Sequence, residues 1–177
     1  MKHILPVLTL TTLTVAAFAD AGAAAPVAPA SAGLSYNRVG LSYVTGGDGN
    51  PCSLQASAFI GSSNVLVSAH ADLTAAGYDS VSIGYVFKNV FAGADVAVAV
   101  ATDDIYSIQV RRALGEVLSG LEVALGYQRN IGSAWNGGLV YEVSYNLTKQ
   151  YSVAYSIQDP KGSIYNSVNS VALRYNF

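Results

Sequence analysis

The sequence has a single cysteine, few charged residues and, after residue 19, no long apolar run. A lone cysteine, Cys52, cannot form an internal disulfide, so other interactions must hold the fold. Charged residues make up only 11% of the chain, and eleven acidic residues outnumber nine basic ones, which excludes a basic nucleic-acid-binding surface. No later apolar run approaches the roughly 20 residues that a membrane-spanning helix requires. The chain is therefore hydrophobic without a disulfide framework or a membrane helix after residue 19.

The first 33 residues differ from the rest of the chain. A short, weakly basic start precedes an apolar stretch that ends in the small-x-small sequence Ala17-Phe18-Ala19, which predicts a cleaved secretory signal peptide over residues 1–19. A retained membrane anchor is the alternative, but Pro6 and four threonines make the run too short and too polar to span. Residues 20–33 are rich in Ala, Pro, Gly and Ser, which predicts a flexible periplasmic linker.

The hydrophobic residues of the remaining chain are dispersed with a period of two. They make up 51% of the sequence, yet they alternate with Ser, Gly, Asn and Gln. The stretch YSVAYSIQ at 151–158 is typical, with Tyr, Val, Tyr and Ile on one face of a strand and small or polar residues on the other. A membrane-spanning barrel produces this pattern because one face of every strand meets lipid and the other faces a polar interior.

Ten such segments occur between residue 34 and the end of the chain, and most are near the 9 to 11 residues of a tilted spanning strand. They cover 34–44, 53–60, 65–73, 80–87, 91–101, 106–111, 121–128, 139–146, 151–158 and a last segment from about 164. The prediction for 34–177 is an all-β, closed, antiparallel up-and-down transmembrane barrel of about ten strands, with eight as the alternative. The stretch from Arg111 to Leu125 also fits a helical period, so its strand boundaries are ambiguous.

The connections between the segments alternate in length. Compact turns are predicted at 61–64, 88–89 and 147–150, and mostly longer, glycine-rich loops at 45–52, 74–79, 130–137 and 159–163. If both termini lie in the periplasm, the compact set becomes the periplasmic turns and the longer set the outer loops. Trp135 would then lie in an outer loop, as an interfacial anchor or a contact for a partner.

The aromatic residues fall at two depths of this predicted barrel. Such belts are expected where amphipathic rings meet the two membrane interfaces, although tyrosine is also simply a good strand residue. The predicted periplasmic girdle consists of Tyr85, Phe87, Tyr145, Tyr151, Tyr175 and Phe177. The predicted outer girdle consists of Tyr43, Tyr106 and Tyr127, together with Tyr165.

Six charged residues are expected to point into the barrel: three bases and three acids. They are Arg38, Asp95, Arg111, Glu122, Glu142 and Arg174. Charges in a confined lumen are costly unless they are paired, so we expect a salt-bridged plug, with a charged constriction that filters ions as the alternative. His70 and Asp72 are interpreted as a polar interior pair. The sequence predicts no catalytic, cofactor-binding or metal-binding residues.

The last seven residues, VALRYNF, carry the most specific signal. Val171, Leu173, Tyr175 and Phe177 form one apolar face that ends on a C-terminal aromatic residue. This resembles the C-terminal strand of Gram-negative outer-membrane β-barrels, in which the terminal Phe is an insertion signal for the barrel-insertion machinery. The whole pattern from Leu34 resembles the small outer-membrane barrels, including OmpA-like membrane domains and porin-like proteins, with ten segments rather than eight and no peptidoglycan-binding domain.

The resemblance implies a bacterial outer-membrane location, with outer-membrane lipid, lipopolysaccharide and the insertion machinery as partners. Two functions are expected from the residues. The first is a structural or surface-interaction barrel with a charge-plugged interior and no enzymatic activity or cofactor. The second is a narrow porin-like channel for water or small ions. Short loops weaken the adhesive form of the first hypothesis, and the interior charges weaken the second.

Overall fold

The structure is a computed structural model that describes residues 34–45, 52–73, 79–102, 104–131, 137–159 and 167–177. The predicted signal peptide and linker, Trp135 and Tyr165 lie outside these residues. No helix in the described part of the chain is long and apolar enough to cross a membrane.

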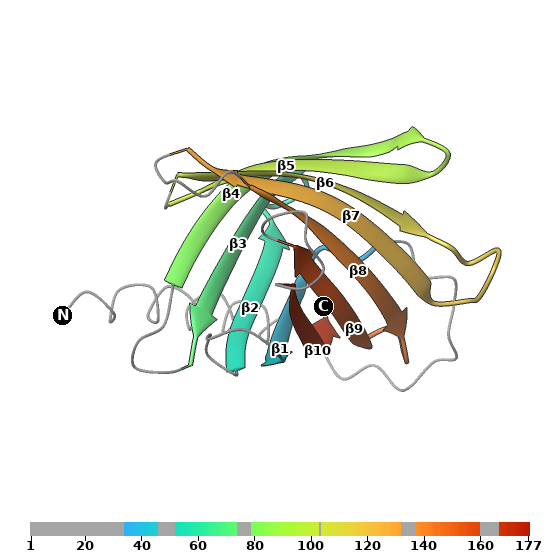
Figure 1. Ribbon diagram of the computed structural model, residues 1–177. Helices are drawn as coiled ribbons and strands as arrows, with labels where there is room; N and C mark the ends of the chain where they lie inside the picture. Colours follow the sequence, from blue (N-terminus) through green and yellow to red (C-terminus); the bar gives the residue numbers. More distant parts are fainter. Residues whose placement is uncertain (1–33, 46–51, 74–78, 103, 132–136, 160–166) are drawn as a thin grey trace.

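Ten antiparallel strands form one closed barrel, in which each strand pairs with its neighbours in sequence and β1 pairs with β10 (Figure 1). The strands are β1 (Arg38–Thr45), β2 (Cys52–Phe59), β3 (Val65–Asp72), β4 (Asp79–Phe91), β5 (Ala94–Ala101), β6 (Ile105–Ala113), β7 (Leu121–Asn130), β8 (Gly138–Asn146), β9 (Tyr151–Asp159) and β10 (Val168–Asn176). The predicted all-β, up-and-down barrel of ten strands is confirmed, and the alternative of eight strands is wrong. Closure leaves no free sheet edge in the ring.

The strand register aligns the apolar face of each strand with that of the next. Leu41 lies between Leu173 and Leu54, and Leu54 pairs in turn with Ala71. Leu41 and Leu173 are 51% and 56% exposed on the outer face, whereas Ala71 is buried. A barrel with many large apolar side chains exposed on its outside and paired charges buried inside suits a lipid surround.

The turn between β4 and β5 lies further along the chain than predicted. Residues 88–89 are not the turn, because β4 continues to Phe91 and the chain reverses at Ala92 and Gly93. The register shifts between Phe87 and Phe91, and Asn89 has a positive φ of 54° there. The extra length is a β-bulge, which period-two counting cannot detect.

The ambiguous stretch after Arg111 is strand, turn and strand rather than helix. β6 ends at Ala113, and the Leu114 N–H donates to the Leu121 carbonyl at 2.8 Å to close the hairpin. Gly120 completes the turn with a φ of 85°, and a Cβ at this position would lie 2.9 Å from the Asn146 carbonyl oxygen. A glycine therefore fits this position where a larger residue would be strained.

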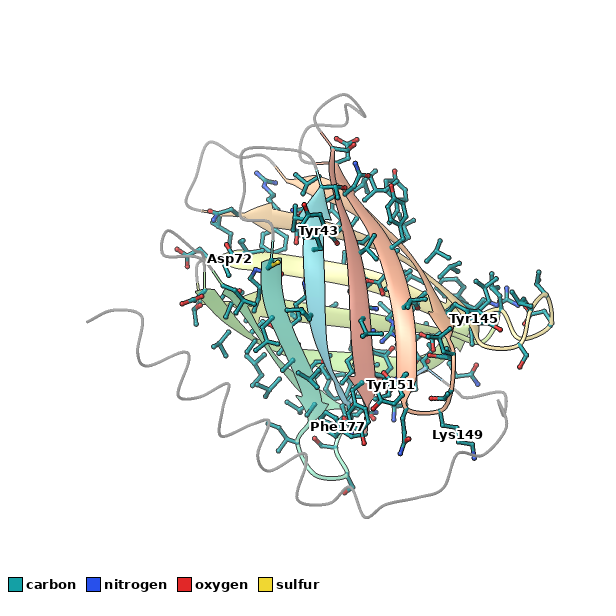
Figure 2. The ribbon with its side chains drawn as sticks, turned by 90° about the horizontal axis from the view of Figure 1, so that it is seen from below. Tyr43, Asp72, Tyr145, Lys149, Tyr151 and Phe177 are labelled. Carbon is teal, nitrogen blue, oxygen red and sulfur yellow. The ribbon has the colours of Figure 1, made fainter. Side chains whose placement is uncertain are left out.

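The two ends of the barrel differ. One end, called the turn end below, holds the start of β1 and the chain's last residue. It also holds the short connections 60–64, 92–93, 114–120 and 147–150. The opposite end, where β1 ends at Thr45 and β3 at Asp72, is called the loop end. Figure 2 shows Tyr43 and Asp72 near the loop end, and Tyr151, Lys149 and Phe177 near the turn end.

Candidate functional site: the barrel interior

The inward faces of the strands enclose a polar lumen. Two cavities of about 300 Å³ and about 600 Å³ share much of their lining, so they form one interior space. The shared lining includes Arg38, Gln55, His70, Gln109 and Arg174. A solute inside the lumen would contact these side chains.

Glu142 on β8 is the centre of the first charge cluster. Arg174 on β10 reaches it with both terminal nitrogens, Nη1 to Oε1 and Nη2 to Oε2, each at 2.6 Å. Such bidentate pairs are the strongest ion pairs between side chains. Arg38 on β1 lies further away, with Nη1 4.0 Å from Oε1, and its side chain is 21% exposed against 7% for Arg174. Gly40 makes room for the pair, because a Cβ there would lie 2.8 Å from the Arg174 Cγ.

A second cluster joins β6, β7 and β8. The Arg111 Nη2 donates to the Glu122 Oε2 at 2.9 Å, and the Asn146 Nδ2 donates to the Glu122 Oε1 at 2.9 Å. The Arg111 and Glu122 side chains are both almost fully buried. Glu122 thus has a charged partner on one oxygen and an amide on the other, which offsets the cost of its burial.

Tyr36 crosses the interior at the turn end. It precedes β1, yet its hydroxyl donates to the Asp95 Oδ2 on β5 at 3.0 Å. Its ring lies 4.6 Å from the Arg111 guanidinium carbon and 5.1 Å from the Phe59 ring centroid. Burial raises the pKa of the Tyr36 phenol above its usual value, so the hydroxyl keeps its proton at neutral pH.

The segment around Tyr36 spans the barrel from one wall to the opposite one. The Arg111 Nη1 donates to the Ser35 carbonyl at 3.1 Å, and β6 is five strands from β1 in the ring of ten. On the near side, the Ser57 Oγ of β2 donates to the Tyr36 carbonyl at 2.7 Å. Tyr36 is only 5% exposed, so its ring fills this part of the lumen.

The structure places the six predicted interior charges in three groups. Glu142 lies with Arg174 and Arg38, and Glu122 lies with Arg111. Asp95 does not share a described ion pair with an arginine; it accepts hydrogen bonds from Tyr36 and from the Asn89 N–H at 2.8 Å.

Two members of these groups were missing from the predicted network, Tyr36 and Asn146. Tyr36 precedes β1, where no strand pairing fixes the direction of its side chain. Asn146 has the same parity as Glu142 on β8, so the alternation places it inside, and it was not predicted as a partner because it is uncharged. An interior network is therefore better predicted from the parity of all polar side chains than from charges alone.

His70 and Asp72 lie apart from these clusters, near the loop end of β3. Their side chains are 3.2 Å apart, from the His70 Nε2 to the Asp72 Oδ1. Among the described residues, no group of three His, Cys, Asp or Glu side chains is placed to hold a metal ion. The pair is a polar contact at the cavity wall.

The predicted girdle residues lie on the outer face. Tyr85, Phe87, Tyr145, Tyr151 and Phe177 are exposed towards the turn end, and Tyr175 packs edge-on against Tyr151 at 5.4 Å between centroids. Tyr43 lies at the other end, as Figure 2 shows, and is exposed. Tyr127 is also exposed, and Tyr106 is half-buried. The insertion-signal residues Val171, Leu173, Tyr175 and Phe177 share this outer face on β10 and just after it.

The fold and its exterior define the class of this protein as a closed, ten-stranded antiparallel β-barrel with an apolar outer face and a polar interior. No family model matches the chain, and no curated protein matches it. Among solved structures, it is similar to the KdgM porin, with 14% identity, a TM-score of 0.47 and coverage of 79% of this chain and 99% of that one.

Two further solved structures are similar at lower scores. The NanC porin is 10% identical, with a TM-score of 0.41 and coverage of 79% of this chain and 98% of that one. The outer-membrane protein Omp33 of Acinetobacter baumannii is 10% identical, with a TM-score of 0.37 and coverage of 82% and 100%.

Proposed function

We propose that this chain is an outer-membrane barrel with a structural or surface-interaction role, and that its lumen is closed at the turn end. The observation that carries the proposal is the pairing of the interior charges. Arg174 and Glu142 form a bidentate pair, and Arg111 and Glu122 form a second pair that is almost fully buried. Charges that neutralise each other in this way fill a lumen and leave little field to attract a passing ion.

The proposed closure is strengthened by the neutral side chains that cross the same region. Tyr36 lies against Arg111, and Asn146 takes the second oxygen of Glu122. A lumen of about eight strands is already narrow enough for side chains to fill, and ten strands widen it modestly. A scaffold needs no catalytic step, so the proposal includes no enzymatic activity and no cofactor.

A narrow channel for water or small ions is the second candidate function. The cavity of about 600 Å³, lined by serine and glutamine side chains together with Glu142 and Arg174, favours it. Arg38 has the weakest ion pair of the three arginines, since its closest described carboxylate oxygen is 4.0 Å away. In this alternative the charged cluster would be a constriction that a hydrated solute passes.

The proposed location is the bacterial outer membrane, reached through a cleaved signal peptide. The apolar exterior and the exposed aromatic residues at both ends suit a lipid bilayer with polar interfaces. The insertion signal for the barrel-insertion machinery would consist of Val171, Leu173, Tyr175 and Phe177. Lipopolysaccharide and outer-membrane lipid would contact the same outer face.

Two experiments test this proposal. The mature protein should fractionate with outer membranes and migrate faster on unheated than on heated detergent gels, because a closed barrel has no edge from which unfolding can begin. Liposomes that contain the folded protein should not swell in a small uncharged sugar. Recovery in the soluble periplasm would contradict the location, and rapid swelling would favour the channel.

Deleting Phe177 tests the targeting part of the proposal. Loss of the terminal aromatic should lower the amount of heat-modifiable barrel in the outer membrane while export across the inner membrane continues. Replacing Phe177 with Tyr keeps an aromatic residue and is the matched control. Unchanged assembly after the deletion would contradict the proposed signal.

A further inference from the structure

We infer that residues Leu34–Asn37, called the crossing segment below, are a removable stopper of the lumen, and that their withdrawal opens a latent pore. The inference rests on the proposed closure at the turn end and adds which part of that closure can move. The clusters around Glu142 and Glu122 belong to the barrel wall, because all of their members lie on strands. Tyr36 precedes β1 and belongs to the crossing segment.

Five hydrogen bonds attach the crossing segment to the barrel. Three hold Ser35 and Tyr36 as described above, to Arg111, Asp95 and Ser57. Two more hold Asn37, whose side-chain oxygen accepts from the Phe59 N–H at 2.9 Å and whose carbonyl accepts from the Phe177 N–H at 3.0 Å. Four of the five bonds use a side chain as donor or acceptor.

The strand ladder does not depend on this segment. The registers of β1 with β2 and with β10 both begin at Arg38 and run to the loop end. Withdrawal of Ser35 and Tyr36 would therefore leave every one of these pairings intact. Each lost hydrogen bond can be replaced by water, which makes its net loss small compared with opening the barrel wall.

The Tyr36 side chain borders the lumen. Tyr36 lines the cavity of about 300 Å³ together with Arg38 and Arg111, and this cavity shares its lining with the larger one towards the loop end. The ion pairs stay fixed to the strands, and Tyr36 lies between the Arg111–Glu122 pair and Ser57 on the opposite side. We therefore expect removal of the ring to leave a gap beside that pair, through which the lumen would join the turn end. The mouth would then be lined by Asp95, Arg111 and Glu122, whose charges are of both signs, so the open pore should select only weakly between cations and anions.

Single-channel recording of the full-length mature protein in planar bilayers tests the inference. Tyr36→Ala should raise the open probability about tenfold or more over the wild type, because it removes the bond to Asp95 and the contact with Arg111. Tyr36→Phe is the matched control: it keeps the ring over Arg111 and loses only the hydroxyl. It should stay mostly closed, with an open probability between those of the wild type and the alanine variant.

A second variant keeps the test decisive if Tyr36→Ala does not fold, as judged by heat modifiability. Ser57→Ala removes one attachment of the segment without leaving a large hole, and it should raise the open probability by a smaller factor. If the wild type is closed and a folded Tyr36→Ala or Ser57→Ala variant is equally closed, the inference about the crossing segment is wrong, while the proposed closure stands. A wild type that conducts steadily would overturn the proposed closure first, so the two failures are distinguishable.

Discussion

The turn-end and loop-end halves of the lumen differ in the side chains that line them, charged in the first and mostly neutral in the second. Towards the turn end, buried arginines and carboxylates are paired, and Tyr36 crosses between the walls. Towards the loop end, neutral hydroxyls pair across neighbouring strands: the Ser42 and Ser53 Oγ atoms are 2.7 Å apart.

The difference shows where this barrel depends on charge. A neutral serine can exchange its partner for water at little cost, so the loop-end half can hold an open cavity. A buried arginine without its carboxylate cannot be satisfied so easily, so the turn-end half depends on its complete set of partners. Substitutions at the two ends should therefore differ in size.

Glu142→Ala should have the largest effect. It leaves Arg174 buried without its bidentate partner, a loss of about 3 to 5 kcal/mol in a dry site and less in a wet lumen. The temperature at which the fast-migrating gel band converts to the slow one should fall clearly. Gln158→Ala, which truncates a neutral side chain lining the larger cavity, is the control and should change that temperature little. Equal effects of the two variants would remove the distinction between the halves.

Asn146→Ala should have an intermediate effect. It removes the donor to the Glu122 Oε1 but leaves the Arg111–Glu122 pair in place, so the expected loss is about 1 to 2 kcal/mol. Thermal unfolding in detergent, followed by far-ultraviolet circular dichroism, measures it. Asn146→Asp, which brings a second carboxylate against Glu122, should be worse than the alanine variant. An aspartate variant as stable as the wild type would show that Glu122 is not held as described.

Arg38→Ala should have the smallest effect in the turn-end half. Arg38 is more exposed than Arg174 and sits 4.0 Å from a carboxylate that Arg174 already satisfies, so the expected loss is at most about 1 kcal/mol. Comparison with Arg174→Ala in the same thermal assay sharpens the ranking, because that variant should lose several times more. A reversed order would mean that Arg38 is the principal partner of Glu142.

The sequence predicted the barrel because its alternation runs through ten segments, and a period of two survives small errors in boundaries. It failed at Asn89, since a bulge shifts the register without changing the composition of the strand. It did not predict which of the six charges meet. The pairs Arg174–Glu142 and Arg38–Glu142 join strands that are not neighbours, so they depend on barrel curvature and side-chain reach.

Tyr36 was beyond the sequence argument for another physical reason. A residue in front of the first strand has no ladder to fix its direction, and the bond to Asp95 is known only once the ring of strands is closed. The position of Tyr36 in the turn-end half is therefore known from the fold and not from the sequence pattern.

Single-channel recording of the unmodified mature protein in planar bilayers is the decisive test of closure at the turn end. We predict no steady conductance at moderate voltage of either polarity or in a salt gradient of either direction, with brief openings at most. A steady, ohmic conductance in the wild type, together with an unchanged melting temperature for Glu142→Ala, would contradict it and show that the interior charges line an open constriction.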